Sequence, residues 1–175
     1  TLSTIYSAKG TDKIDLTGIT RSSVINLNAG TFSSINQLKP NSTTNTSYSG
    51  NSNVSIAFGS KINNIDLSTS NTADTVILNA AYKSNAFNAI KNFQAADKIG
   101  LSSSVFGNLS ADNIDIGVGR TTANTAKSKI LVDSTTGIIY YDADANGKAS
   151  KAVKVAQFTK VANMTIAKGN FSFLS

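Results

Sequence analysis

The sequence contains no cysteine, histidine, tryptophan or glutamate, and Pro40 is the single proline in 175 residues. The lack of cysteine excludes disulfides and thiolate metal sites. The lack of histidine excludes any zinc site, catalytic triad or general base that depends on an imidazole. All ten acidic residues are aspartate. Because aspartate favours turns whereas glutamate favours helices, we expect a mainly β protein. Because the chain has no histidine, we expect that it is not an enzyme.

Positive charge is in excess, but it is not clustered. Sixteen basic residues against ten acidic ones give a net charge of +6, and only two of the basic residues are arginine. The closest groupings are Lys127 with Lys129, and Lys148 with Lys151 and Lys154. A nucleic-acid site normally combines clustered arginine with stacking aromatic residues, so we expect solvated strand faces and no nucleic-acid partner. No apolar run approaches the ~18 residues of a spanning helix, so we expect no membrane insertion.

A short polar turn, an aspartate and a short apolar strand recur along the chain. Residues 12–16 read Asp-Lys-Ile-Asp-Leu and residues 97–101 read Asp-Lys-Ile-Gly-Leu, with looser copies at 63–68 and 72–78. Apolar and polar residues alternate in these segments, which gives each strand one apolar face. Repetition of this kind is typical of stacked β rungs. We expect one core to contain Ile14, Leu16, Ile25, Leu27, Ile56, Val76, Leu78, Ile99 and Leu101.

The pattern predicts two halves that pack as one unit. Residues 1–90 are expected to form a short, degenerate β-roll, a parallel β stack, with a loop insertion at 37–52 that contains the proline. Residues 91–175 are expected to form an antiparallel, β-sandwich-like C-terminal cap.

Several local structures are predicted in the second half of the chain. Residues 129–142 read as a hairpin, and the alternating segment 152–158 is expected to pair with it. A short helical turn is expected at 102–106. The segment 80–94 fits either one helical turn or a strand at 89–93, because its apolar residues suit both periods. The apolar end, Asn170 to Leu174, is expected to form a strand that buries both of its phenylalanines.

Three blocks of the sequence carry a resemblance to a known family. They comprise residues 4–35, residues 53–65, and residues 90–107 together with the later segment 137–144. In this order they resemble the C-terminal module of the serralysin-type secreted metalloproteases, a branch of the RTX calcium β-roll proteins. The resemblance covers most of the chain outside the 37–52 insertion.

The resemblance implies a β-roll closed by a C-terminal cap and exported by a type I secretion machinery. It therefore implies a location outside a bacterium or on its surface. Thr1 is not an initiator residue, so we expect a fragment or mature form with further domains of the parent protein upstream. The zinc motif of the resembled proteases has no counterpart here, because the chain has no histidine.

Calcium is the cofactor that the resemblance implies, but the turns that would bind it are altered. The family binds calcium in Gly-Gly-x-Gly-x-Asp turns, whose oxygen ligands suit a hard cation. Here the corresponding turn, residues 66–74, contains no glycine. In the first block, Ser7 and Lys9 replace an aspartate and a glycine, which leaves Asp12 as a weak metal candidate. We expect a roll that does not require calcium, with lysine and hydroxyl side chains bridging the rungs instead.

One other segment has the spacing of a calcium loop. Asp142, Asp144 and Asn146 place oxygen-bearing side chains at alternate positions. An EF-hand would continue to a glutamate at its twelfth position, where this chain has Val153, and the flanks read as strands. The alternative is a hairpin turn rich in the residues that turns favour.

The sequence favours a non-catalytic function. We expect the structural and secretion-associated C-terminal module of an exported bacterial protein, and the hydroxyl-rich, lysine-rich composition is also similar to that of surface-layer proteins. The pairs Asp112/Asp115 and Asp142/Asp144 fit a glycosidase less well than a solvated loop, and the accessory domain of a secreted hydrolase is a weaker alternative. Self-assembly or binding of a cell-surface glycan, as in an adhesin, is the other alternative, and its candidate residues are Tyr48, Tyr82, Tyr140 and Tyr141.

Overall fold

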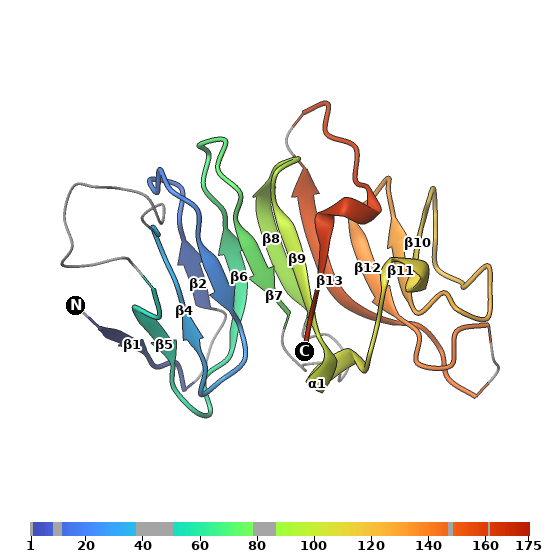
Figure 1. Cartoon of the computed structure of the whole chain (residues 1–175), viewed down its shortest axis with the longest axis horizontal. Helices are drawn as coiled ribbons and strands as arrows, with labels where there is room; N and C mark the ends of the chain where they lie inside the picture. The colour runs from blue at the N-terminus through green and yellow to red at the C-terminus, as the bar shows by residue number, and fades with distance from the viewer. Residues whose placement is uncertain (1, 9–11, 38–50, 79–86, 147–148, 161) are drawn as a thin grey trace.

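The computed structural model describes residues 2–8, 12–37, 51–78, 87–146, 149–160 and 162–175. The described chain is mainly β, with fourteen strands in three sheets and one short α-helix. Its rungs follow one another along the long axis of the molecule (Figure 1). Loop residues 38–50, most of the predicted insertion, lie outside the described residues, as does Lys9.

Four successive rungs build the centre of the molecule, and each contributes one strand to each of two facing sheets. The strands of neighbouring rungs run parallel. The rungs are β2 (Asp12–Asp15) with β3 (Val24–Asn26), β6 (Ile62–Asp66) with β7 (Thr75–Ile77), β8 (Asn88–Phe93) with β9 (Lys98–Ser102), and β13 (Val153–Lys160) with β14 (Phe171–Leu174).

The strand register explains why the same pattern recurs in the sequence. In parallel stacking, equivalent residues of successive rungs lie directly above one another. In one sheet the aligned inward residues are Ile14, Ile65, Ile90 and Phe158. In the other they are Ile25, Val76, Ile99 and Phe171. All eight are buried and belong to one hydrophobic cluster between the sheets, so the alternation of each strand fills a continuous core.

A small sheet lies at the N-terminal end of the roll (Figure 1). Its order is β1-β5-β4, with β1 (Ser3–Ile5) parallel to β5 (Val54–Ile56) and β4 (Phe32–Ser33) antiparallel to it. Ile56 points into the core, where it is almost fully buried. The opposite face of this sheet contains exposed apolar side chains, which are described below.

A mixed part of the fold is inserted between the third and fourth rungs. It contains α1 (Ser103–Phe106), the 3₁₀ turn η1 (Ala111–Asn113), β10 (Ile114–Gly117), β11 (Ile130–Asp133) and β12 (Ile138–Tyr141), and a second 3₁₀ turn, η2 (Lys168–Asn170), precedes β14. Strands β11, β12 and β13 are antiparallel neighbours that extend the sheet of β8, β6 and β2, whereas β10 at the edge of this sheet runs parallel to β11. This sheet therefore runs through both of the halves expected from the sequence.

Gly137 makes the β11–β12 hairpin possible. It has a φ of +70°, and a Cβ placed on it would lie 2.1 Å from the carbonyl oxygen of Phe158. A side chain would therefore separate β12 from β13 as well as strain the turn.

The fold class expected from the sequence is confirmed, as are several local features. All nine residues predicted to share one core are buried in it. The hairpin, its pairing with residues 153–158 and the helical turn at 103–106 are present. At the ambiguous segment the strand is correct, since β8 covers 88–93. The burial of both terminal phenylalanines is only half correct, because Phe171 is 6% exposed and Phe173 is 37% exposed.

Leu16 and Leu101 provide a direct test of the stacked core. Each is nearly fully buried, whereas Leu2 is 64% exposed and serves as a matched control. Leu16→Ala and Leu101→Ala should each lower the free energy of unfolding by ~2–5 kcal/mol, because the cavity adds to the lost transfer energy. Leu2→Ala should cost under ~0.5 kcal/mol. Denaturant unfolding measures all three, and a control-sized loss at both buried positions would contradict the core.

Candidate functional sites

The corner between the two sheets is where a calcium-binding turn would lie in a roll of the resembled family. The residue directly before the second strand of each of the first three rungs is Ser23, Asp74 or Asp97. The two carboxylates are each only 1% exposed. They come into the same corner because the strands that follow them, β3, β7 and β9, are parallel and in register.

Each of these carboxylates links its own turn to the rung before it. Asp74 Oδ1 accepts from the backbone N–H of Ser23 at 2.8 Å, and its Oδ2 accepts from that of Ser68 at 3.3 Å. Asp97 Oδ1 accepts from the N–H of Asp74 at 3.0 Å, and its Oδ2 from that of Gln94 at 2.8 Å. We refer to Ser23, Asp74 and Asp97 as the corner ladder.

Asn170 extends the corner ladder to the fourth rung. Its side-chain amide donates to the carbonyl oxygens of Ala95 at 2.9 Å and Asp97 at 3.0 Å, and its Oδ1 accepts from the N–H of Ala167. An asparagine suits this position because it supplies donors to carbonyls, which a carboxylate cannot do. All four rungs are therefore connected by side chains at one corner.

Burial dominates the electrostatics of the corner ladder. Loss of water raises the pKa of Asp97 to about 6, although the N–H donors of Gln94 and Asp74 oppose the rise. The neighbouring carboxylate of Asp74 adds a smaller upward effect. Burial likewise raises the pKa of Asp74, against the donors from Ser23 and Ser68. The N–H dipoles of the backbone thus stabilise the charged form of both carboxylates against the cost of burial.

These corner turns do not fit calcium. The ion takes six to eight oxygen ligands, whereas both oxygens of Asp74 and of Asp97 accept from N–H groups. The positive ends of those N–H groups occupy the directions from which a cation would approach. Asp12, the weak candidate of the first turn, is half-buried, and its Oδ2 accepts from the Ser7 hydroxyl.

Other polar side chains bridge neighbouring parallel strands, and both lysine and hydroxyl groups take part. Lys13 Nζ on β2 lies 2.8 Å from Asp66 of β6 and 3.0 Å from Asp15. The hydroxyls of Thr4 and Ser55 are 2.8 Å apart between β1 and β5. These contacts are exposed, so each contributes little alone.

The predicted loop site lies immediately after β12. Asp142 is 5% exposed, Asp144 is half-buried and Asn146 is exposed. Asp144 accepts from the Ala149 N–H at 2.8 Å and from the hydroxyl and N–H of Ser150. These donors lower the pKa of Asp144 to about 2, with the Ser150 hydroxyl as the largest cause.

Asp142 is in a different environment from Asp144. Burial raises the pKa of Asp142, and the nearby Asp144 carboxylate raises it further. The Oδ1 atom of Asp142 is buried without a hydrogen-bond partner. The described part of the chain contains no group of three or more His, Cys, Asp or Glu side chains placed to hold a metal, so any ion here would also need amide, hydroxyl or water ligands.

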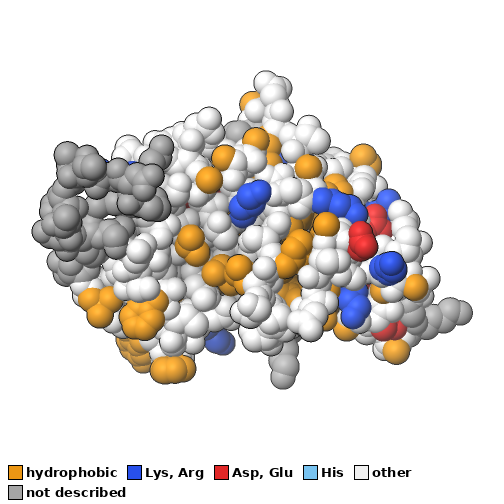
Figure 2. Space-filling view, viewed as in Figure 1, with side chains coloured by type: hydrophobic (Ala, Val, Ile, Leu, Met, Phe, Trp, Pro, Cys, Tyr) orange, Lys and Arg blue, Asp and Glu red, His pale blue; other side chains and the backbone are white. Residues whose placement is uncertain are grey.

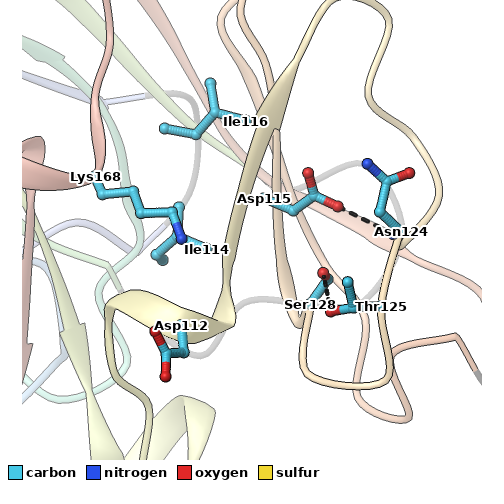
Figure 3. Close-up of a pocket in the computed structure, with 8 residues that line it drawn as sticks. All are labelled: Asp112, Ile114, Asp115, Ile116, Asn124, Thr125, Ser128 and Lys168. Atoms are coloured by element: carbon cyan, nitrogen blue, oxygen red, sulfur yellow. Dashed lines mark hydrogen bonds between the residues drawn. The ribbon is translucent and has the colours of Figure 1, made fainter.

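Asp112 and Asp115 line a shallow hollow beside β10 (Figure 3). Asp115 Oδ1 pairs with Arg120 Nε at 3.1 Å, and its Oδ2 accepts from the Asn124 N–H at 3.0 Å. Asp112 points away from Asp115 at the other end of the hollow (Figure 3). Asp115 thus secures the 117–128 loop, and the two carboxylates do not converge as a catalytic pair would.

Of the four tyrosines proposed to bind a ligand, Tyr141 packs within the fold, Tyr140 is half-buried, and the other two lie outside the described residues. Tyr141 packs edge-on against Phe106, with ring centroids 5.4 Å apart, and its hydroxyl donates to the Phe106 carbonyl. Tyr140 is half-buried. Tyr48 and Tyr82 fall in segments that the structure does not describe.

An exposed apolar face on the N-terminal β1-β5-β4 sheet was not predicted from the sequence. Strand register places Thr4, Ser55 and Phe32 side by side on that face, and Leu2 and Tyr6 share it by alternation with Thr4. All three apolar side chains are exposed by more than half, as is that of Phe58 in the turn after β5. Hydrophobic side chains gather at this end of the molecule (Figure 2). Alternation alone identified two faces of the strand but not which of them would be buried.

No family model and no curated protein matches the sequence. Among the described residues, no helix has the length and apolar character needed to span a membrane. The functional interpretation therefore depends on the chain's own residues.

The raised pKa of Asp97 predicts a specific pH dependence. Its folded-state pKa of about 6 lies above the ordinary value of 3.8, so the folded protein binds more protons than the unfolded chain between these values. Stability from this group is therefore greatest below about pH 4 and falls, by on the order of 1–3 kcal/mol, as pH rises to about 6. Asp97→Asn should flatten the fall measured by denaturant unfolding.

Asp112→Asn, at an exposed aspartate, is the control and should keep the wild-type slope. The Asp97→Asn protein will also be less stable at every pH, because an amide offers one acceptor where the turn presents two donors. The diagnostic quantity is the slope between pH 4 and 6.5. A wild-type slope in Asp97→Asn would show that this carboxylate does not titrate as described.

Proposed function

We propose that this chain is a non-catalytic structural and secretion-associated module of an exported bacterial protein, of the surface-layer or RTX type. The observation that carries the proposal is the corner ladder, which joins the rungs through buried carboxylates. The repeated residues of the chain thus serve to hold one rung on the next. A stack of this kind is a scaffold that extends by adding rungs.

The aspartates support a structural role. Asp74 and Asp97 bind backbone N–H groups, and Asp115 pairs with Arg120. The sequence supplies no histidine, cysteine or glutamate to replace them in catalysis. A scaffold needs no nucleophile or general base, and this is the simplest function for such a set of side chains.

The ends of the roll suggest how it would work within a larger protein. Strand β2 is the last strand of its sheet and leaves one edge without a strand partner among the described residues, whereas Val24 of β3 forms an antiparallel bridge with Ser34 beside β4. Preceding rungs or domains of a parent protein, or another copy of the module, would extend the β2 edge and cover the apolar face around Phe32. At the other end, β14 pairs with β9 and fixes the C-terminal residues.

Binding to a cell-surface glycan, as in an adhesin, is the second candidate function. It is favoured by one observation, the exposed side chains of Tyr6, Phe32 and Phe58 on and beside one sheet. Aromatic faces stack on sugar rings for the same reason that they pack on other apolar surfaces. The same side chains suit self-assembly, which belongs to the first proposal.

Deletion of residues 170–175 tests the proposed function. The deletion removes the Asn170 amide from the corner ladder and the buried Phe171 ring, so the thermal midpoint should fall. In a bacterium with a type I secretion system, export of the truncated chain should fall as well. Phe171→Ala is the matched control, since it destabilises the fold while leaving the rest of the terminal sequence in place.

The control should be exported, because it keeps the terminal segment that the machinery would recognise. Unchanged export of the deletion variant would contradict the secretion role and favour the binding module. Equal loss of export in the deletion and in Phe171→Ala would attribute the defect to folding, and it would likewise contradict a recognition role.

A further inference from the structure

The outer face of the N-terminal β1-β5-β4 sheet carries apolar side chains that no described residue covers. Leu2, Tyr6 and Phe32 lie on this face, and each is more than half exposed. A Cβ placed on Gly30 would lie 2.4 Å from the ring of Phe58, so this exposed ring also lies close to the start of β4. Hydrophobic side chains gather at this end of the molecule (Figure 2).

The size of this face can be compared with what an interface needs. An aromatic side chain has about 150–250 Å² of surface to bury, so the four exposed side chains together present on the order of 500 Å². A patch of that size is at the upper end of what a monomeric protein leaves in water. A stable interface buries at least about 1,000 Å² over its two sides. Two copies of this face supply that area between them.

Charge limits the kind of partner that this face fits. Residues 2–8, 31–36 and 53–58, which form the sheet and its borders, contain no charged side chain. The chain as a whole has a net charge of +6, so an acidic partner would be attracted to other surfaces. Two copies of a basic chain repel one another least where neither is charged. An uncharged apolar sheet face is therefore complementary to a second copy of itself.

The polar groups at the centre of the face are compatible with burial. The hydroxyls of Thr4 and Ser55 lie 2.8 Å apart and share a hydrogen bond between β1 and β5. A hydroxyl that already has a partner is less costly to bury than one that loses its only partner, water. On the inner face of the same sheet, Ile56 packs in the core. Covering the outer face would make this sheet a layer buried on both sides, as in stacked sheets.

We propose that two copies of this chain associate face to face through their β1-β5-β4 sheets. The same face of each copy packs on the other across a two-fold axis, so the assembly closes as a dimer. With only about 1,000 Å² buried, the interface belongs to the weak class, and we expect a Kd of roughly 1–100 µM. The inference rests on the proposed structural function, which it deepens by naming the partner of the module.

Sedimentation of the full chain over a concentration series tests the association. The weight-average mass should rise from the 18.2 kDa of one chain towards twice that value and no further. Tyr6→Lys and Phe32→Lys each place like charges on both sides of the interface, so each should weaken association at least tenfold. Val118→Lys is the matched control, because Val118 is 84% exposed in the turn after β10. It adds the same charge away from the sheet and should associate as the wild type does.

Four results would overturn the proposal. They are a chain that stays monomeric up to about 1 mM, ten times the weakest Kd expected, association that survives both substitutions in the sheet, association lost equally in Val118→Lys, and a mass above that of a dimer. A monomeric chain that binds a glycan through this face would favour the second candidate function. Circular dichroism verifies that each variant is folded. Tyr6→Lys keeps the test decisive if Phe32→Lys does not fold, because Tyr6 lies outside the strands.

The outcome can be separated from that of the export experiment. Deletion of residues 170–175 removes β14, which belongs to a different sheet from β1, β5 and β4. A monomeric chain whose export still requires residues 170–175 would contradict the dimer alone. A dimeric chain whose export does not require them would contradict the secretion role alone.

Discussion

The roll depends on hydrogen bonds between buried carboxylates and the backbone of the preceding rung. Parallel strands in register bring Ser23, Asp74 and Asp97 to one corner, where water is excluded. A buried carboxylate is tolerated only if its oxygens are satisfied, and here each oxygen meets an N–H from its own turn or from the rung before. These bonds define the path of the chain from one sheet to the other. The inward residues of both sheets then meet in one core.

The same bonds account for a roll without glycine-rich turns. A calcium turn needs glycines so that its carbonyl oxygens can converge on an ion, whereas the corner ladder needs N–H groups that converge on a carboxylate. Residues 68–72 of this turn can therefore be serine, threonine and asparagine, which form turns through their own side chains. The Lys13 ammonium lies between Asp15 of its own strand and Asp66 of the next rung, so it also joins two rungs, at an exposed position.

The core could be predicted from the sequence because burial and alternation coincide in each rung, as at Ile14 and Leu16. The β11–β12 hairpin could be predicted from its two apolar segments and the short polar turn between them. The partners that Asp74 and Asp97 find in the preceding rung could not be predicted, since Ser23 and Asp74 lie more than twenty residues away from them in the sequence. The parallel pairing of β13 with β8 was also hidden, because sixty residues and a hairpin separate them. In the loop, spacing identified Asp142 and Asp144, but only the fold showed that one oxygen is buried alone.

The most direct test of the central claim is thermal unfolding of the chain in millimolar calcium and in excess chelator. If backbone N–H groups hold the corner carboxylates, the two melting temperatures should agree within a few degrees. A fall of tens of degrees in chelator would show that a cation stabilises the roll, and it would contradict the account.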